Sequence, residues 1–242
     1  MATDTHSLPS VAEIAGAIDH AILKPEFTRD EVDASLDLAR RLHLFSVCVR
    51  PSDIRHAVRR LDGSGVAVVT VIGFPHGTTT TATKVAEALE AVANGAVELD
   101  MVLNIGRLKS GLIVDVEEDI RQVVNAANGL VVKVILETTL LTDEEIVAGC
   151  RAAEAAGADF VKTSTGFAGG GATPHAVELM RASVSDTVEI KASGGMRDLD
   201  ALLVLRELGA TRFGTSSSEA ILAELARRHG DAVDSDAVVG DY

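Results

Sequence analysis

Tryptophan is absent from this 242-residue sequence, which also has only one tyrosine, six phenylalanines and five prolines. Aromatic side chains are therefore too few to build a core. The 47% of hydrophobic residues must supply an aliphatic interior made chiefly of Val, Ile, Leu and Ala. Such a core is typical of domains that pack helices against a sheet.

Cysteine is almost as scarce. Cys48 and Cys150 lie too far apart for a metal-type motif, and a domain of this size needs no disulfide. No basic segment followed by an apolar run opens the chain, and no apolar run approaches the roughly 18 residues of a membrane helix. We therefore expect reduced thiols, a cytoplasmic location and no membrane partner.

An excess of basic residues is also lacking, since 36 acidic residues face 22 lysines and arginines, for a net charge of -14. This charge repels nucleic-acid phosphates and argues against nucleic acid as a partner. A small anion can still bind where backbone N–H groups and a few cations gather. The seven histidines show no HxH or HExxH spacing, so no metal site is predicted.

What the sequence does contain is a regular alternation of strand-like and helix-like segments. A short helix is expected near residues 10–17, followed by eight apolar runs at 17–24, 45–49, 66–74, 96–104, 130–138, 158–165, 188–193 and 211–215. Segments with helical spacing separate them, for example 28–44, 81–96, 142–158 and 198–210. Strict alternation predicts a parallel sheet.

Eight strand-helix units indicate a closed (β/α)₈ TIM barrel rather than an open, doubly wound sheet. The first strand leads into KPEFT and not into the glycine-rich turn of a dinucleotide-binding sheet. We expect one domain over residues 1–228. The polar stretch 229–242 has no apolar period and is predicted to be a mobile tail, long enough for Tyr242 to reach the barrel mouth.

Charged residues interrupt the strands in a pattern that matters for function. Alternate residues of a barrel strand face the helices or the interior. In residues 97–101, Val97, Leu99 and Met101 share the apolar face, so the residues between them point inward. The same parity turns a set of charged side chains into the barrel: Glu98, Asp100, Lys133, Glu137, Lys162, Glu189 and Lys191.

Buried charge is costly, so these residues serve either as structural ion pairs or as a catalytic site. Asp100, Lys162 and Lys191 lie toward the C-terminal strand ends, where barrel active sites are built, whereas Glu98 and Glu189 are expected one layer lower. Position favours catalysis for the upper three.

Two lysines on adjacent strands predict a specific chemistry. An ordinary lysine, with a pKa of about 10.4, is protonated and cannot attack a carbonyl. A neighbouring ammonium and burial lower that pKa and free the amine. Lys162 is the predicted Schiff-base nucleophile, Lys191 the perturbing cation and Asp100 a proton relay, with the deeper Lys133 as the competing nucleophile. The resulting iminium would be an electron sink for breaking a carbon-carbon bond.

Small residues fill three consecutive loops after the last strands, at 164–174, 192–198 and 213–220, and each loop precedes a helix. Backbone N–H groups in such turns bind phosphate, and the corresponding barrel loops often do so. One Gly-Gly pair is more often a tight turn than a ligand site. Three such loops together predict a phosphate site.

The motifs IDHAILKPEFT, VIGFPHGTTTTATKVAEA, ELDMVLNIGRLKSG, GADFVKTSTGFAGGGATP and IKASGGMRD resemble the deoxyribose-phosphate aldolase family, and the likeness runs from about residue 16 to 226. The resemblance implies reversible cleavage of 2-deoxy-D-ribose 5-phosphate to D-glyceraldehyde 3-phosphate and acetaldehyde, without metal or organic cofactor. It implies a Schiff base on Lys162, assisted by Lys191 and Asp100, with Asp19 and Lys133 in support. It also implies a homodimer and phosphate contacts from Gly166, Gly194, Gly195, Gly214, Ser216 and Ser217.

Three positions depart from the family pattern: Phe167 stands where some members have lysine, Ala21 replaces a usual threonine, and His76 interrupts an FPLG motif. Two other functions fit the residues: a non-catalytic barrel that binds sugar phosphates, and a Schiff-base enzyme acting on a keto acid. A metal-dependent aldolase would lack its ligands. Cys48 is expected to point inward as a small hydrophobe, with no part in the chemistry.

Overall fold

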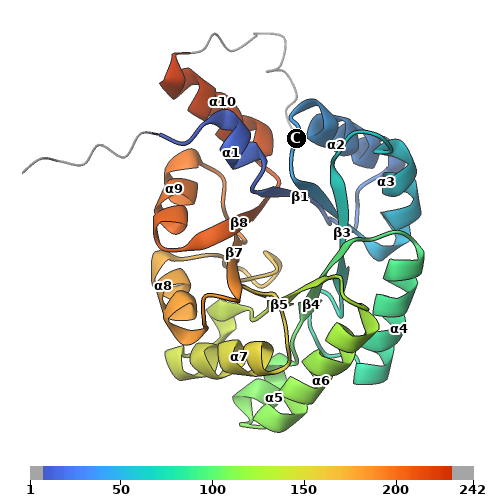
Figure 1. Cartoon of the computed structure of the whole chain (residues 1–242), viewed down its shortest axis with the longest axis vertical. Helices are drawn as coiled ribbons and strands as arrows, with labels where there is room; N and C mark the ends of the chain where they lie inside the picture. The colour runs from blue at the N-terminus through green and yellow to red at the C-terminus, as the bar shows by residue number, and fades with distance from the viewer. Residues whose placement is uncertain (1–7, 231–242) are drawn as a thin grey trace, which may run out of the picture.

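The computed structural model describes residues 8–230, which form a closed barrel of eight parallel strands in sequence order (Figure 1). The predicted (β/α)₈ barrel is thereby confirmed. Of the predicted tail, residues 231–242, including Tyr242, lie outside the described range. The strands are β1 (Ile18–Ile22), β2 (Ser46–Val49), β3 (Ala67–Ile72), β4 (Glu98–Val102), β5 (Val131–Ile135), β6 (Phe160–Lys162), β7 (Glu189–Ser193) and β8 (Ala210–Thr215).

Helices surround the strands, and α1 lies beside α10, the helix that follows the last strand (Figure 1). None of the helices in the described range is long and apolar enough to cross a bilayer. The helices are α1 (Val11–Ala15), α2 (Arg29–Arg41), α3 (Ile54–Arg60), α4 (Thr81–Ala93), α5 (Ile105–Lys109), α6 (Ile113–Ala126), α7 (Asp143–Ala155), α8 (Pro174–Ser183), α9 (Leu199–Glu207) and α10 (Ser218–His229), with 3₁₀ turns η1 (Pro51–Asp53) and η2 (Thr138–Leu140).

Local sequence signals start several of these helices. Ser10, Thr28 and Thr142 each precede a helix, and each forms a capping box with the glutamate three residues later. In a capping box the hydroxyl accepts from a backbone N–H of the first turn, while the glutamate accepts from the N–H of the capping residue. At Thr28 and Thr142 the cap sets the residue at which the loop after β1 or β5 ends and the next helix begins.

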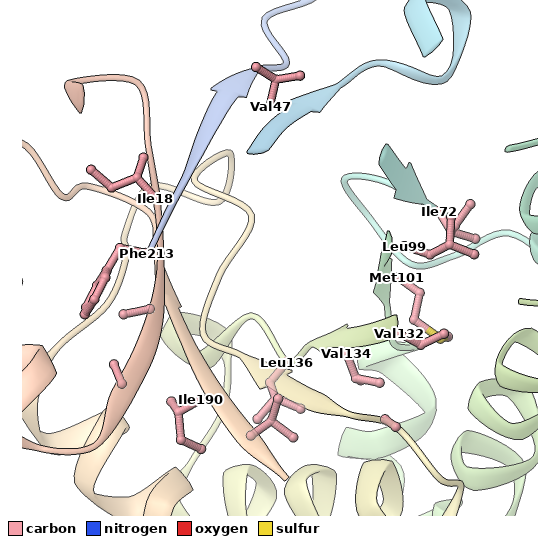
Figure 2. Close-up of a cluster of buried hydrophobic side chains, with 14 of the residues drawn as sticks. Ile18, Val47, Ile72, Leu99, Met101, Val132, Val134, Leu136, Ile190 and Phe213 are labelled. Atoms are coloured by element: carbon pink, nitrogen blue, oxygen red, sulfur yellow. The ribbon is translucent and has the colours of Figure 1, made fainter. Parts of the chain in front are cut away.

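The core lies between the strands and the helices. Leu99, Met101, Val132 and Val134 are fully buried on the helix-facing side of β4 and β5, as the alternation of polar and apolar residues predicts. Figure 2 shows these side chains among others of the same layer, including Ile190 and Phe213. Aliphatic residues supply most of the cluster, in line with the scarcity of aromatic residues.

The barrel interior is divided by chemistry. Cys48, Val69 and Val71 form a small apolar cluster inside β2 and β3, with Leu23 and Phe74 packed against it. The remaining strands carry charged groups into the interior. Two residues at lower strand ends are more exposed than the alternation predicts: Val97, which precedes β4, is 45% exposed, and Glu189 is exposed at the start of β7.

Glu137 also departs from the expectation, because it lies beyond the end of β5 in a left-handed backbone conformation, with φ of 62°. Its buried carboxylate accepts hydrogen bonds from the backbone N–H and the hydroxyl of Thr165. Glu137 therefore holds the loop after β6 in place and contributes no charge to the middle of the barrel.

Candidate active site

Seven charged side chains meet inside the barrel, and we call them the ionic cluster: Asp19, Glu98, Asp100, Lys133, Lys162, Lys191 and Arg212. They come from β1, β4, β5, β6, β7 and β8. Adjacent strands in register bring them to the same height, since Asp100 is paired with Lys133 and Lys162 with Lys191. Within residues 8–230 every buried side-chain nitrogen and oxygen has a hydrogen-bond partner, so no cluster member is left unsatisfied.

Asp100 joins three lysines. Its Oδ2 accepts from Nζ of Lys162 at 2.7 Å and from Nζ of Lys191 at 2.7 Å, and its Oδ1 accepts from Nζ of Lys133 at 2.9 Å. The carboxyl is fully buried. The three residues predicted for catalysis therefore lie in direct contact, and Lys133 lies on the opposite oxygen of the same carboxylate.

The lower half of the cluster completes the pairing. Lys191 also donates to Asp19, and Lys133 also donates to Glu98. Arg212 reaches both of these carboxylates, with Nη1 at 2.9 Å from Asp19 and 3.1 Å from Glu98. Arg212 was not singled out from the sequence, although Phe213 faces the helices and parity alone places both its neighbours inward.

Burial and charge affect the two upper lysines differently. Burial is the largest influence on the pKa of Lys162 and lowers it; Asp100 opposes this and Lys191 reinforces it, so the pKa lies below its ordinary value. Burial also lowers the pKa of Lys191, but Asp100 and Asp19 outweigh it and the net pKa is raised. Lys162 is thus the lysine that can lose its proton, while Lys191 stays an ammonium.

The carboxylates of Asp100 and Asp19 stay ionised. Burial by itself raises the pKa of Asp100, but the three lysines around it hold that pKa well below its ordinary value. The pKa of Asp19 is lowered in the same way against its burial, by Lys191, Lys133 and Arg212. Burial raises the pKa of the Cys48 thiol to about 11, so this side chain remains protonated and unreactive near neutral pH.

A cavity of about 310 Å³ opens above the cluster at the C-terminal strand ends. Lys162, Lys191 and Asp19 line its floor, together with Cys48 and Ala21. Lys133 is completely buried and does not line the cavity. The arrangement gives a carbonyl compound access to Lys162 and withholds it from Lys133.

The predicted phosphate loops form one side of this cavity. Its lining includes Gly166, Gly194, Gly195, Gly214 and Ser216, five of the six predicted phosphate contacts. Ser217 is not part of the lining, and its backbone N–H donates instead to the hydroxyl of Thr215 at 2.9 Å.

Glycine is required at two of these positions by close approach. A Cβ on Gly194, where φ is 90°, would lie 2.8 Å from Cα of Gly171 in the facing loop. A Cβ on Gly214 would lie 2.8 Å from Cβ of Ser193 and 3.3 Å from Cε of Lys191. Gly214 therefore leaves room for the Lys191 side chain to cross the barrel.

The rim carries features that the sequence argument missed. The cations Lys24 and Arg197 line the cavity and are exposed, and neither was predicted. Phe167, where the resemblance implies that some family members have a lysine, is 46% exposed and meets Phe74 edge to face, with ring centroids 5.3 Å apart. Positive charge near the cavity thus comes from loops after β1 and β7 and not from position 167.

Potential metal ligands do not converge: residues 8–230 contain no group of three or more His, Cys, Asp or Glu side chains arranged to hold an ion. The carboxylates of the ionic cluster are instead paired with the side chains of lysine and arginine. The absence of a metal from the reaction stays a prediction.

Comparisons with known proteins agree on one family. The model of the DeoC/LacD family aldolases matches residues 14–221. The deoxyribose-phosphate aldolase of Staphylococcus haemolyticus is 55% identical over 208 residues, which are 86% of this chain and 94% of the relative. Deoxyribose-phosphate aldolase 2 of Staphylococcus aureus strain MRSA252 is 54% identical over 211 residues, 87% of this chain and 96% of the relative.

Solved structures agree. The tetrameric deoxyribose phosphate aldolase from Aeropyrum pernix superposes with a TM-score of 0.82 at 31% identity, over 88% of this chain and 91% of that one. An aldolase named QR15 gives a TM-score of 0.85 at 40% identity, over 90% of this chain and 97% of that one. The predicted family is confirmed, and this chain belongs to the DeoC/LacD family of aldolases.

Proposed function

We propose that this chain reversibly cleaves 2-deoxy-D-ribose 5-phosphate to D-glyceraldehyde 3-phosphate and acetaldehyde through a Schiff base on Lys162, in the breakdown of deoxyribonucleotides. One observation carries the mechanism: Lys162 lies at the cavity floor with a lowered pKa, on the carboxylate oxygen that also binds the ammonium of Lys191. The family relatives support the choice of substrate.

In the synthetic direction, the free amine of Lys162 attacks the carbonyl carbon of acetaldehyde, and loss of water leaves an iminium. Lys191 and Asp100 relay protons: one is delivered to the departing hydroxyl and one is removed from the methyl carbon. Lys191 lines the cavity and exchanges protons with the substrate, and Asp100, fully buried beneath it, exchanges them through Lys191. The enamine so formed attacks the aldehyde carbon of D-glyceraldehyde 3-phosphate, whose oxygen takes up a proton. Water then hydrolyses the new iminium, which releases the sugar phosphate and restores the amine. Cleavage runs through the same steps in reverse.

Phosphate binding is assigned to the glycine-rich side of the cavity. Gly166, Gly194, Gly195, Gly214 and Ser216 surround the space in which backbone N–H groups can meet an anion. Asp19 and Lys133 act beneath the site by holding Lys191 and Asp100 in position. The predicted cytoplasmic location and homodimer remain part of this proposal, and size-exclusion chromatography with light scattering tests the second.

Reductive trapping tests the proposed function. Borohydride added with acetaldehyde should increase the intact mass of the wild-type protein by one ethyl group, and peptide mapping should place that group on Lys162. Lys162→Ala should lose both adduct and turnover, while the matched variant Lys109→Ala, at an exposed lysine paired with Glu145, should keep both.

Three results would contradict the proposal. A Lys162→Ala protein that retains most turnover refutes the assignment of the nucleophile. A wild-type protein that binds the sugar phosphate but gives no adduct is a binding barrel and not an aldolase. Faster turnover of a keto-deoxy acid than of deoxyribose 5-phosphate refutes the substrate assignment.

A further inference from the structure

Arg212 closes the ionic cluster from below and contributes a charge that it cannot lose. Its guanidinium lies over the ring of Phe45, 3.6 Å from the ring centroid, and its side chain is 11% exposed. Arginine stays protonated under all conditions in which proteins fold. Unlike the three lysines, it cannot relieve the cluster by releasing a proton.

The charges of the ionic cluster do not balance when every member is ionised. Three carboxylates, of Asp19, Glu98 and Asp100, face four cations, of Lys133, Lys162, Lys191 and Arg212. Glu137 does not correct the difference, because its carboxylate is bound to Thr165 and forms no ion pair with the cluster. A surplus positive charge in a buried site is unfavourable, and release of one proton removes it.

The pairing pattern identifies the group that gives up this proton. Lys133 is paired with three carboxylates, Glu98, Asp100 and, at 3.9 Å, Asp19, and Lys191 is paired with two, Asp19 and Asp100. Lys162 is bound to Asp100 alone. The least-paired ammonium is the least stabilised, and Lys162, unlike Lys133, also lines the cavity.

We infer that Arg212 and Glu98 are positioning residues whose opposite charges, beneath the site, decide that Lys162 is held as a free amine. Arg212 supplies the permanent cation that creates the surplus, and Glu98 limits that surplus to one charge. Neither residue lines the cavity, so both act through the cluster and not on the substrate. This inference rests on the proposed Schiff-base reaction of Lys162.

The charged and titratable groups facing Lys162 are Asp100, Lys191, Cys48 and, one contact further, Asp19 and Lys133. Replacing a member below these alters the charge without altering any contact of Lys162. A unit charge acting across roughly 10 Å at an effective dielectric constant of about 20 moves a pKa by about one unit. The expected displacement is therefore about one pH unit for each substitution.

The test follows the initial rate of borohydride trapping of acetaldehyde on the Lys162 peptide as a function of pH. This rate rises with the fraction of free amine, so its acid limb reports the pKa of Lys162. Arg212→Met removes the surplus and should move the limb to higher pH by about one unit, slowing trapping about tenfold on that limb. Glu98→Gln enlarges the surplus and should move the limb about one unit lower.

Two further variants separate charge from packing. Arg212→Lys gives up the planar stack on Phe45 but keeps the positive charge, so its limb should stay at the wild-type pH. The double variant Arg212→Met/Glu98→Gln has a surplus of one charge again, and its limb should return to within a few tenths of a unit of wild type. Thermal melts establish which variants are folded, and if Arg212→Met is not, Glu98→Gln and Arg212→Lys decide.

Opposite shifts for the two single substitutions, cancelled in the double variant, support the inference. Lower trapping rates in Arg212→Met and Glu98→Gln with an unmoved limb overturn it, because a purely structural role changes the rate at every pH. Failure of the wild-type protein to form any adduct is a different result, which refutes the proposed function itself.

Discussion

Replacing Lys191 by methionine tests how far a neighbouring charge sets the reactivity of Lys162. Both Nζ atoms lie 2.7 Å from Oδ2 of Asp100. Two unit charges on one such oxygen are separated by at most roughly 5 Å, and at an effective dielectric constant of about 20 they repel by about 3 kcal/mol. That energy corresponds to about two pKa units. Methionine preserves most of the stem volume and removes the charge.

We expect the pKa of Lys162 to rise by about two units in Lys191→Met. Lys191 has a raised pKa and stays an ammonium near neutral pH, so its positive charge acts on Lys162 in the wild-type protein. The acid limb of kcat/KM should move to higher pH by the same amount, and activity below the limb should fall about a hundredfold. Raising the pH should recover only part of the loss, because the proposed mechanism also uses Lys191 for proton transfer.

The assay is kcat/KM for cleavage of deoxyribose 5-phosphate over the full pH range in which the protein stays folded. Lys191→Arg is the control, since arginine keeps a positive charge beside Asp100 and Asp19, and its limb should not move even where its maximum rate is lower. A Lys191→Met limb that coincides with the wild-type limb would refute the electrostatic explanation and leave burial alone as the cause of the lowered pKa.

Three further predictions follow from the contacts. Asp100→Asn should lower turnover 10²- to 10⁴-fold through loss of the proton relay. It should also lower the free energy of unfolding in urea by about 3–5 kcal/mol, because it removes the carboxylate partner of Lys162 and one carboxylate partner each of Lys133 and Lys191. Turnover within tenfold of wild type would contradict the relay. Gly214→Ala should reduce kcat/KM at least about tenfold, because its Cβ would press on Ser193 and Lys191; unchanged kinetics would contradict that crowding. Burial lowers the pKa of His20 to about 4. As the pH falls from about 6.5, His20 is therefore protonated in the unfolded chain before it is protonated in the folded one, and about 3 kcal/mol of stability should be lost by about pH 4. Urea denaturation of His20→Gln over this pH range should show a loss of stability that is smaller by that amount.

Most of the barrel could be predicted from the sequence because its strands alternate strictly. Leu99 and Met101 are apolar on one side of Asp100, so a two-residue period places the carboxylate inside. The same period places Lys133 and Lys162 inside on the next two strands. The register between neighbouring parallel strands then brings these residues together inside the barrel.

Alternation along a strand does not predict how deeply a side chain is buried at the strand ends. Glu189 and Val97 occupy positions that alternation assigns to the interior and to the helix layer, yet both lie at lower strand ends where neither layer covers them. Alternation describes direction and not depth, so exposure at a strand end depends on how far the surrounding loops extend. Glu137 shows the same limit at the upper end, where a left-handed residue turns the chain out of the strand.

The positions of residues in the loops could not be predicted from the sequence. Lys24, Arg197 and Ser217 have their places decided by turns whose shape depends on contacts with other loops. Arg212 is a different case, because the period of β8 already contained it: Gly214, two residues later, was assigned to the site, and a residue two positions away shares its face. A charged side chain in an apolar strand is therefore informative even where no motif includes it.

The charge surplus of the ionic cluster has a consequence for the carbon-carbon step and not only for the resting amine. In the proposed reaction, condensation of Lys162 with the substrate gives a protonated Schiff base, an iminium, which restores the fourth cation beside Asp100 and Lys191. Conversion of the iminium to the neutral enamine removes that charge again, and in the cleavage direction this conversion is the bond-breaking step. If Lys162 forms the proposed Schiff base, a cluster with one cation more than its carboxylates should destabilise the iminium relative to the transition state leading to the enamine, and so lower the barrier to cleavage. The same imbalance that frees the nucleophile thus also favours the electron flow that breaks the bond.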